Sequence, residues 1–157
     1  MSEQKILVMR HAEKTEDPRD PDLSNDGFER AKRLVTWLPD QFGNPDFIIA
    51  TAPSKHSMRP IETVKPLAKK LDVDIDDSLA DQEYGVLADK LLTKKRFQDK
   101  ITLVCWHHGN IPNLMNALHC KPDSYPYPWD RDIFNLVLVV TFGPDGTPTV
   151  DQVVEPF

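Results

Sequence analysis

Basic and imidazole side chains occur at three places in this sequence, each shortly after an apolar segment. They are Arg10 and His11, then Arg59, and then His107 and His108. An arginine presents a planar fork of donors that fits a phosphate or a carboxylate, and a histidine acts as a nucleophile or proton carrier near neutral pH. Together these residue types are suited to binding an anion and to reacting with it.

The elements that must position these side chains are strands alternating with helices. Apolar runs predict four core strands: Ile6–Met9, Phe47–Thr51, Ile101–Trp106 and Asn135–Phe142. Alternation with helices predicts a three-layer α/β/α fold whose central sheet is mostly parallel. The turn at residues 143–146 joins two strands, so the C-terminal edge of the sheet is expected to be an antiparallel hairpin.

Helical patterns follow each of the first three strands. The expected helices start at the N-cap Ser24 and run to about Trp37, then cover about Ser57–Leu71, Val86–Phe97 and Ile111–Leu118. In the first helix the expected buried face is Phe28, Ala31, Leu34, Val35 and Leu38. Because parallel strands end at one edge of a sheet, the three basic clusters should converge there. Two helix N-termini add backbone donors, so an anion is the expected occupant.

Length, charge and cysteine content exclude several function classes. The 157 residues predict one domain over residues 1–157, and a net charge of -6 argues against a nucleic-acid partner. No apolar run approaches the roughly 18 residues of a membrane span, so no membrane partner is expected. The first residues do not resemble a signal peptide, and Cys105 and Cys120 read as free buried thiols. A cytoplasmic location is therefore expected.

Two features of the histidines limit their roles. His107 and His108 are adjacent, and neighbouring residues of a strand point to opposite faces, so only one of them is expected to face the anion site. No HxH, HxxxH or HExxH spacing occurs, so no metal site is predicted.

Four ordered motifs resemble those of the histidine phosphatase superfamily, also called phosphoglycerate mutase-like. Residues 10–13, Arg-His-Ala-Glu, are similar to its Arg-His-Gly signature, and residues 23–31 resemble its Leu-Thr/Ser-x-x-Gly-x-x-Gln-Ala helix start. Residues 54–63 resemble the segment with a second phosphate-binding arginine, and His108-Gly109 resembles the second catalytic histidine. The likeness covers about residues 5–118, and the length is that of the short phosphohistidine phosphatase-type members.

The resemblance implies a metal-independent phosphatase that needs no cofactor. His11 would be the nucleophile that forms a phosphohistidine intermediate, with Arg10, Arg59 and His108 around the phosphoryl oxygens. The substrate would be a phosphorylated small molecule or a phosphoprotein, carrying a phosphoester or a phosphoramidate. The loop Tyr125–Trp129 either recognises that substrate or serves as a proline-stiffened connection.

Family members usually carry a carboxylate that protonates the leaving group, and two residues compete for this role. Alignment on Tyr84-Gly85 favours Asp81, whereas residue type favours Glu83. Two other functions stay open from sequence: a catalytically weak anion-binding regulatory domain of the same fold, and a mutase-type phosphotransferase. The second is disfavoured because the chain lacks anything that resembles the long insertions of the mutases.

Overall fold

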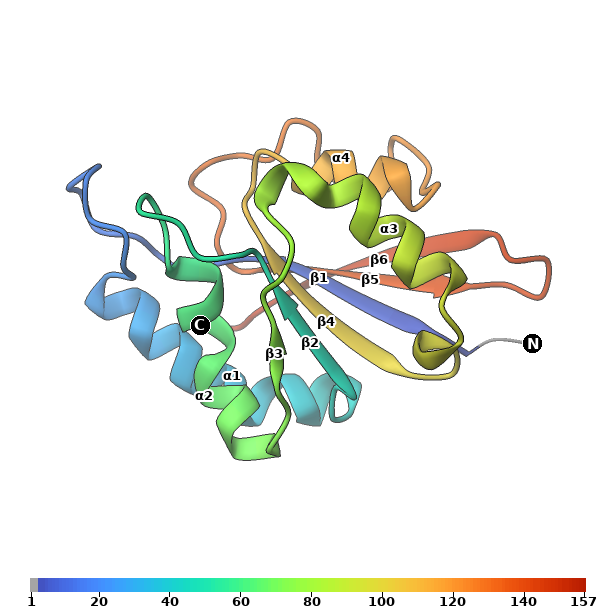
Figure 1. Cartoon of the computed structure of the whole chain (residues 1–157), viewed down its shortest axis with the longest axis horizontal. Coiled ribbons are helices and arrows are strands. Elements are labelled where there is room, and N and C mark those ends of the chain that lie inside the picture. The colour runs from blue at the N-terminus through green and yellow to red at the C-terminus, as the bar shows by residue number, and fades with distance from the viewer. Residues whose placement is uncertain (1–2) are drawn as a thin grey trace.

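A six-stranded sheet forms the centre of the computed structural model, which describes residues 3–157 (Figure 1). The strands lie in the order β3-β2-β4-β1-β5-β6. Their bounds are β1 Lys5–Arg10, β2 Phe47–Ala50, β3 Ile75–Asp76, β4 Ile101–Trp106, β5 Leu136–Phe142 and β6 Pro148–Val154. Pairing is parallel from β3 to β1 and antiparallel for β5 and β6. This confirms the predicted mostly parallel sheet with a C-terminal antiparallel hairpin.

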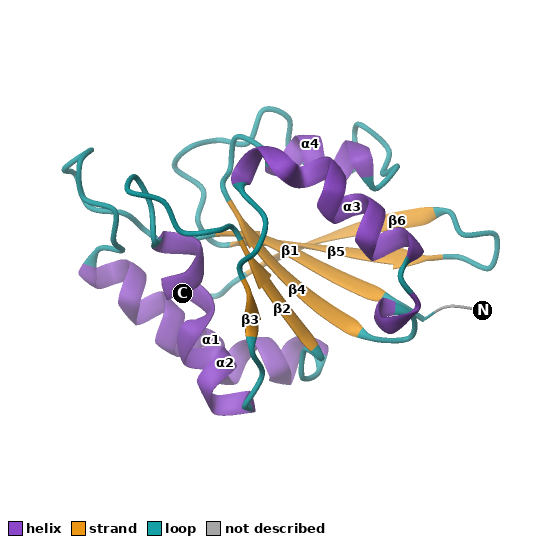
Figure 2. Ribbon diagram, viewed as in Figure 1, coloured by secondary structure: helices purple, strands orange, loops and turns teal. Residues whose placement is uncertain are grey.

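Helices cover both faces of this sheet, as the predicted three layers require. Figure 2 shows α1 (Asn25–Phe42) and α2 (Arg59–Leu71) on one face, and α3 (Tyr84–Thr93) and α4 (Ile111–Ala117) on the other. Two short 3-10 turns, Asp81–Glu83 and Lys95–Phe97, flank α3. None of the helices in residues 3–157 is both long and apolar enough to cross a membrane.

The buried strand β1 shows how the sequence specifies the two layers. Ile6 and Val8 pack into the core under α3 and α4, whereas Leu7 and Met9 pack into the core under α1 and α2. Side chains alternate between the faces of a strand, and both faces here are covered, which explains a continuous apolar run. Cys105 and Cys120 are buried free thiols, as predicted.

Some helix and strand predictions differ from the structure. The predicted end of α1 at Trp37 is wrong, because the helix continues through Pro39 to Phe42 and ends at Gly43, whose φ is 93°. Phe28 is 40% exposed rather than in the core. The buried position at the start of α1 is Gly27, where an added Cβ would lie 2.2 Å from the Glu13 carbonyl oxygen.

Candidate active site

The carboxyl ends of β1 and β4 bring two pairs of functional residues side by side. Arg10 pairs with Trp106 in the parallel ladder, and the His11 backbone N–H donates to the Trp106 carbonyl at 3.1 Å. His11 and His107 therefore occupy equivalent positions, each directly after one of two neighbouring strands. Together with residues of the loops after β2 and β3 they surround a pocket of about 520 Å³, which is lined by Arg10, His11, Lys14, Ala52, Pro53, Ser54, His56, Ser57, Arg59, Ala80, Asp81, Gln82, His107, His108 and Gly109.

His11 is held as a neutral imidazole with one nitrogen fixed. Its Nδ1 lies 2.7 Å from the Ala12 carbonyl oxygen, and the side chain is 2% exposed. A carbonyl accepts only, so Nδ1 carries the proton and Nε2 keeps its lone pair. Burial lowers the pKa of His11 to about 2, against the opposite effect of the Ala12 hydrogen bond. The lone pair of Nε2 is therefore available for nucleophilic attack at neutral pH.

The residues after Arg59 fix the backbone that carries His11. The Thr63 hydroxyl accepts from the Ala12 N–H at 2.9 Å and donates to the Arg59 carbonyl at 2.7 Å. Glu62 accepts from the Leu23 N–H at 3.0 Å, and burial together with the nearby Asp22 carboxyl raises the pKa of Glu62 to about 7. The start of α2 thus holds both ends of the loop that follows β1.

Arg10 is buried and oriented by a segment far along the chain. Its Nη1 donates to the carbonyls of Arg131 and Ile133, and its guanidinium lies 3.8 Å from the centroid of the Phe134 ring. Burial and the nearby Arg59 lower the pKa of Arg10 to about 10, so it stays a cation at neutral pH. Cation–π contact with Phe134 stabilises that charge without neutralising it.

Arg59 is the second cation of the pocket. Its Nη1 donates to the Asp20 carbonyl at 2.8 Å, and burial lowers its pKa. The buried Nε atoms of Arg10 and Arg59 have no hydrogen-bond partner in the part of the chain that the structure describes. Nor does either guanidinium form an ion pair with a carboxylate within residues 3–157. Two guanidiniums with spare donors, that of Arg10 buried and that of Arg59 partly buried, are suited to a dianionic ligand.

Both adjacent histidines line the pocket, so the expectation that only one would face it is wrong. β4 ends at Trp106 and both residues lie in the turn that follows, where strand alternation no longer applies. The His107 ring lies 5.3 Å from the His11 ring, edge-on, and its Nε2 is 3.4 Å from the Thr51 hydroxyl. Burial lowers the pKa of both histidines, that of His108 to about 4, with Arg10 adding to the effect on His108.

His107 is thus a site residue that the sequence argument passed over in favour of His108. His107 can be identified by its position rather than by a motif, because it directly follows β4 as His11 directly follows β1. Its neighbour His108 lies closer to the rim, where it also borders the next recess along the surface.

The structure separates the two acid candidates. Asp81 lines the pocket, whereas Glu83 does not: its carboxylate accepts from the Ala80 N–H at 2.9 Å and caps the 3-10 turn. Asp81 is held from two sides, since Trp106 Nε1 donates to its carbonyl at 3.1 Å and Asn110 Nδ2 donates to its Oδ2 at 3.0 Å. The other oxygen, Oδ1, is buried without a partner among the described residues.

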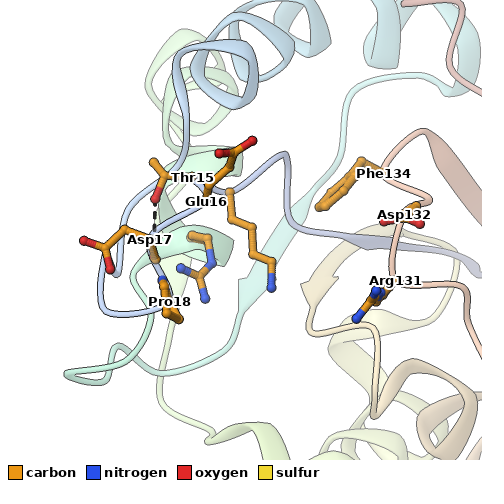
Figure 3. A pocket seen from close by; sticks show the side chains of 9 residues that line it. Thr15, Glu16, Asp17, Pro18, Arg131, Asp132 and Phe134 are labelled. Carbon is orange, nitrogen blue, oxygen red and sulfur yellow. Dashed lines mark hydrogen bonds between the residues drawn. The ribbon is translucent and has the colours of Figure 1, made fainter.

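A second recess of about 580 Å³ borders the pocket of Arg10 and His11 and shares Lys14 and Arg59 with it. It lies between the loop at residues 14–18 and the segment at residues 131–134 (Figure 3). In this view Arg131 and Phe134 lie on one side, and the Asp17 carboxylate on the other side points away from them. The recess is lined by both acidic and basic side chains.

The described residues hold no cluster of side chains suited to binding a metal ion. Nowhere in residues 3–157 do three or more His, Cys, Asp or Glu side chains gather in a way that could hold a metal ion. The positive charges of the pocket come from side chains instead, beside a neutral imidazole and a carboxyl group with one free oxygen. This combination can bind a phosphoryl group, accept it on a histidine nitrogen and protonate the leaving group.

Comparisons with known proteins agree on the fold. The chain superposes on the protein histidine phosphatase SixA complexed with tungstate with a TM-score of 0.72 at 17% identity, covering 96% of each chain. A putative alpha-ribazole-5'-P phosphatase from Escherichia coli gives a TM-score of 0.68 at 13% identity, covering 97% of each. A phosphoglycerate mutase from Plasmodium falciparum gives 0.67 at 15% identity, covering 100% of this chain and 95% of its own.

At the level of sequence, a search of curated proteins found no match. A family model does match, over residues 6–113, which span β1 to α4 and include Arg10, His11, Arg59, Asp81 and both pocket histidines. The chain whose β1 and β4 ends build this pocket therefore belongs to the histidine phosphatase superfamily (branch 1).

Proposed function

We propose that this protein is a phosphatase that works through a phosphohistidine intermediate on His11 and without a metal ion. The observation that carries the proposal is the Nδ1 contact of His11 with the Ala12 carbonyl, which leaves Nε2 free in a pocket with two unpaired guanidiniums. The substrate is a phosphoester or a phosphoramidate.

In the first step Nε2 of His11 attacks phosphorus while the bond between phosphorus and the leaving group breaks. Asp81, protonated on Oδ1, gives its proton to the departing oxygen or nitrogen. Arg10, Arg59 and the two pocket histidines contact the non-bridging oxygens, where negative charge is largest. Fixed cations in a partly dry pocket stabilise such charge more strongly than water does.

In the second step water attacks the phosphorus of phospho-His11. The Asp81 carboxylate takes a proton from that water, the P–N bond breaks, and the electron pair returns to Nε2. The products are orthophosphate and the starting enzyme, with Asp81 again protonated. A single carboxyl group thus serves both steps, because the second is the first run in reverse with water in place of the leaving group.

Replacing His11 tests the proposal. His11→Asn is expected to abolish hydrolysis of p-nitrophenyl phosphate and the formation of an acid-labile phosphoenzyme. His119→Asn is the matched control, since His119 is exposed and has a φ of 67°, a conformation that asparagine adopts readily. The proposal is wrong if the His11 variant folds and retains wild-type turnover.

A further inference from the structure

An uncharged groove continues from the catalytic pocket along α4. A recess of about 430 Å³ shares His108 and Gly109 with the catalytic pocket, and a third recess of about 250 Å³ shares Pro112, Asn113 and Tyr127 with that one. We call these two recesses the α4 groove. No Asp, Glu, Lys or Arg side chain lines it, although 28% of the chain is charged.

The groove begins on the side of the pocket where the leaving group must lie. Asn110, which holds the Asp81 carboxylate, accepts from Asn113 Nδ2 at 2.8 Å, and Asn113 lines the groove. The proton donor and the groove are thus joined by two hydrogen bonds. The charged recess between residues 14–18 and 131–134 has no such link, because none of its lining residues hydrogen-bonds to Asp81 or Asn110 in the part of the chain that the structure describes.

The length of the groove indicates how long a leaving group it can hold. Gly109 lies in the turn before α4, and along the helix the groove runs from Pro112 to Asn116, about 6 Å at 1.5 Å per residue. An extended chain covers that distance in about two residues. A small phosphomonoester fits within the 520 Å³ of the catalytic pocket and would leave the groove empty.

The groove also presents the groups that an extended main chain needs. The Asn113 side-chain oxygen accepts no hydrogen bond from residues 3–157, and Asn116 is exposed on the next turn of α4. Each of these amides can donate to a peptide carbonyl or accept from a peptide N–H. Tyr127 lines the same recess and is 75% exposed, so it offers a large apolar surface to a side chain of the partner.

From these contacts we infer that the substrate is a phosphorylated side chain within a polypeptide, whose neighbouring residues dock in extended form along the α4 groove. The inference rests on the proposed phosphatase function and adds its substrate class. The phosphoryl group occupies the cationic pocket, the side chain passes Asp81 and His108, and about two flanking residues lie against α4.

Comparing substrates of different length tests this. Nine-residue peptides with a central phosphohistidine, phosphoserine or phosphotyrosine are compared with the same phosphorylated residue blocked at both ends, and with p-nitrophenyl phosphate. For the residue that is hydrolysed best, kcat/KM is expected to be at least about tenfold higher for the peptide. Tyr127→Ala and Asn116→Ala should remove most of that gain and leave p-nitrophenyl phosphate hydrolysis unchanged.

Phe28→Ala is the control, because Phe28 is also an exposed large side chain but lines none of the catalytic pocket, the α4 groove or the charged recess. Hydrolysis of p-nitrophenyl phosphate without any preference for the peptides overturns the inference and leaves the phosphatase function standing. A preference for the peptides that survives both groove variants overturns the inference as well. If the wild-type protein hydrolyses none of the substrates, the proposed function fails as well.

Discussion

Replacement of Asp81 by asparagine should slow the hydrolysis of poor leaving groups far more than that of good ones. The substitution is nearly isosteric, and the new side-chain oxygen can still accept from Asn110. Trp106 contacts only the Asp81 main-chain carbonyl, so that hydrogen bond survives. The change therefore removes one proton donor and leaves the pocket otherwise intact.

The size of the effect follows from what the proton does. General acid catalysis contributes on the order of 10²–10⁴-fold, which corresponds to about 2.7–5.5 kcal/mol at 1.36 kcal/mol per tenfold. An alkyl phosphate should lose this full amount, because an alkoxide is a poor leaving group. p-Nitrophenolate leaves without a proton, so p-nitrophenyl phosphate should lose less than about tenfold. The measurement is kcat/KM over a series of phosphomonoesters, for the wild type and the variant.

Glu83→Gln is the matched control, two residues away in the same 3-10 turn. Glu83 accepts from the Ala80 N–H outside the pocket, and glutamine keeps an acceptor there, so all substrates should stay within about twofold of wild type. The assignment of the acid is refuted if Glu83→Gln, rather than Asp81→Asn, produces the loss that grows with leaving-group basicity.

Three further predictions concern stability. Gly27→Ala should destabilise the fold by about 1–3 kcal/mol, because the new Cβ would meet the Glu13 carbonyl. Gly85→Ala, in open space on α3, should stabilise the fold by about 0.5–1 kcal/mol. Urea unfolding measures the free energy of unfolding of both variants. Phosphate at about 100 times its Kd should stabilise the wild type by about 2.7 kcal/mol. Arg59→Gln should abolish this stabilisation. Lys55→Gln, on the exposed loop before α2, is the control and should keep it. His11 binds a proton below about pH 6.5 when unfolded but only near pH 2 when folded, so stability falls as the pH drops through this window; His11→Asn should reduce the slope between pH 6 and 4 by up to about 1.4 kcal/mol per pH unit. No change in that slope would contradict the neutral state of His11.

The sequence predicts those parts of the site that depend on strand ends. Apolar runs locate β1 and β4, and the parallel sheet brings the residues after them together, which is why Arg10 and His11 were found from pattern alone. The N-cap Ser24 and the hairpin turn were likewise predicted, because both depend on residues adjacent in sequence. Where a feature depends on contacts between residues far apart in the chain, the local sequence pattern does not predict it.

The groups that orient Arg10 are an example. Its partners Arg131 and Ile133 lie more than 120 residues away, and the ring beneath it belongs to Phe134, in a segment without regular structure. Nothing in the local composition of that segment indicates which carbonyls point toward β1. The exposure of Phe28 has a similar cause, since the close approach of α1 to the Glu13 carbonyl turns Gly27 rather than Phe28 inward.

The free pocket is electrostatically unfavourable, and this bears on how it recognises its ligand. Burial and the repulsion from Arg59 lower the pKa of Arg10, and neither guanidinium forms an ion pair with a carboxylate within residues 3–157. Backbone carbonyls and the Phe134 ring hold them in place instead. A buried carboxylate partner would stabilise the empty state and compete with phosphate for the same donors. Carboxylates act on the two arginines only from a distance, Asp132 and Glu13 on Arg10 and Asp20 and Glu62 on Arg59, so a dianion that contacts both guanidiniums offsets the cost of their desolvation.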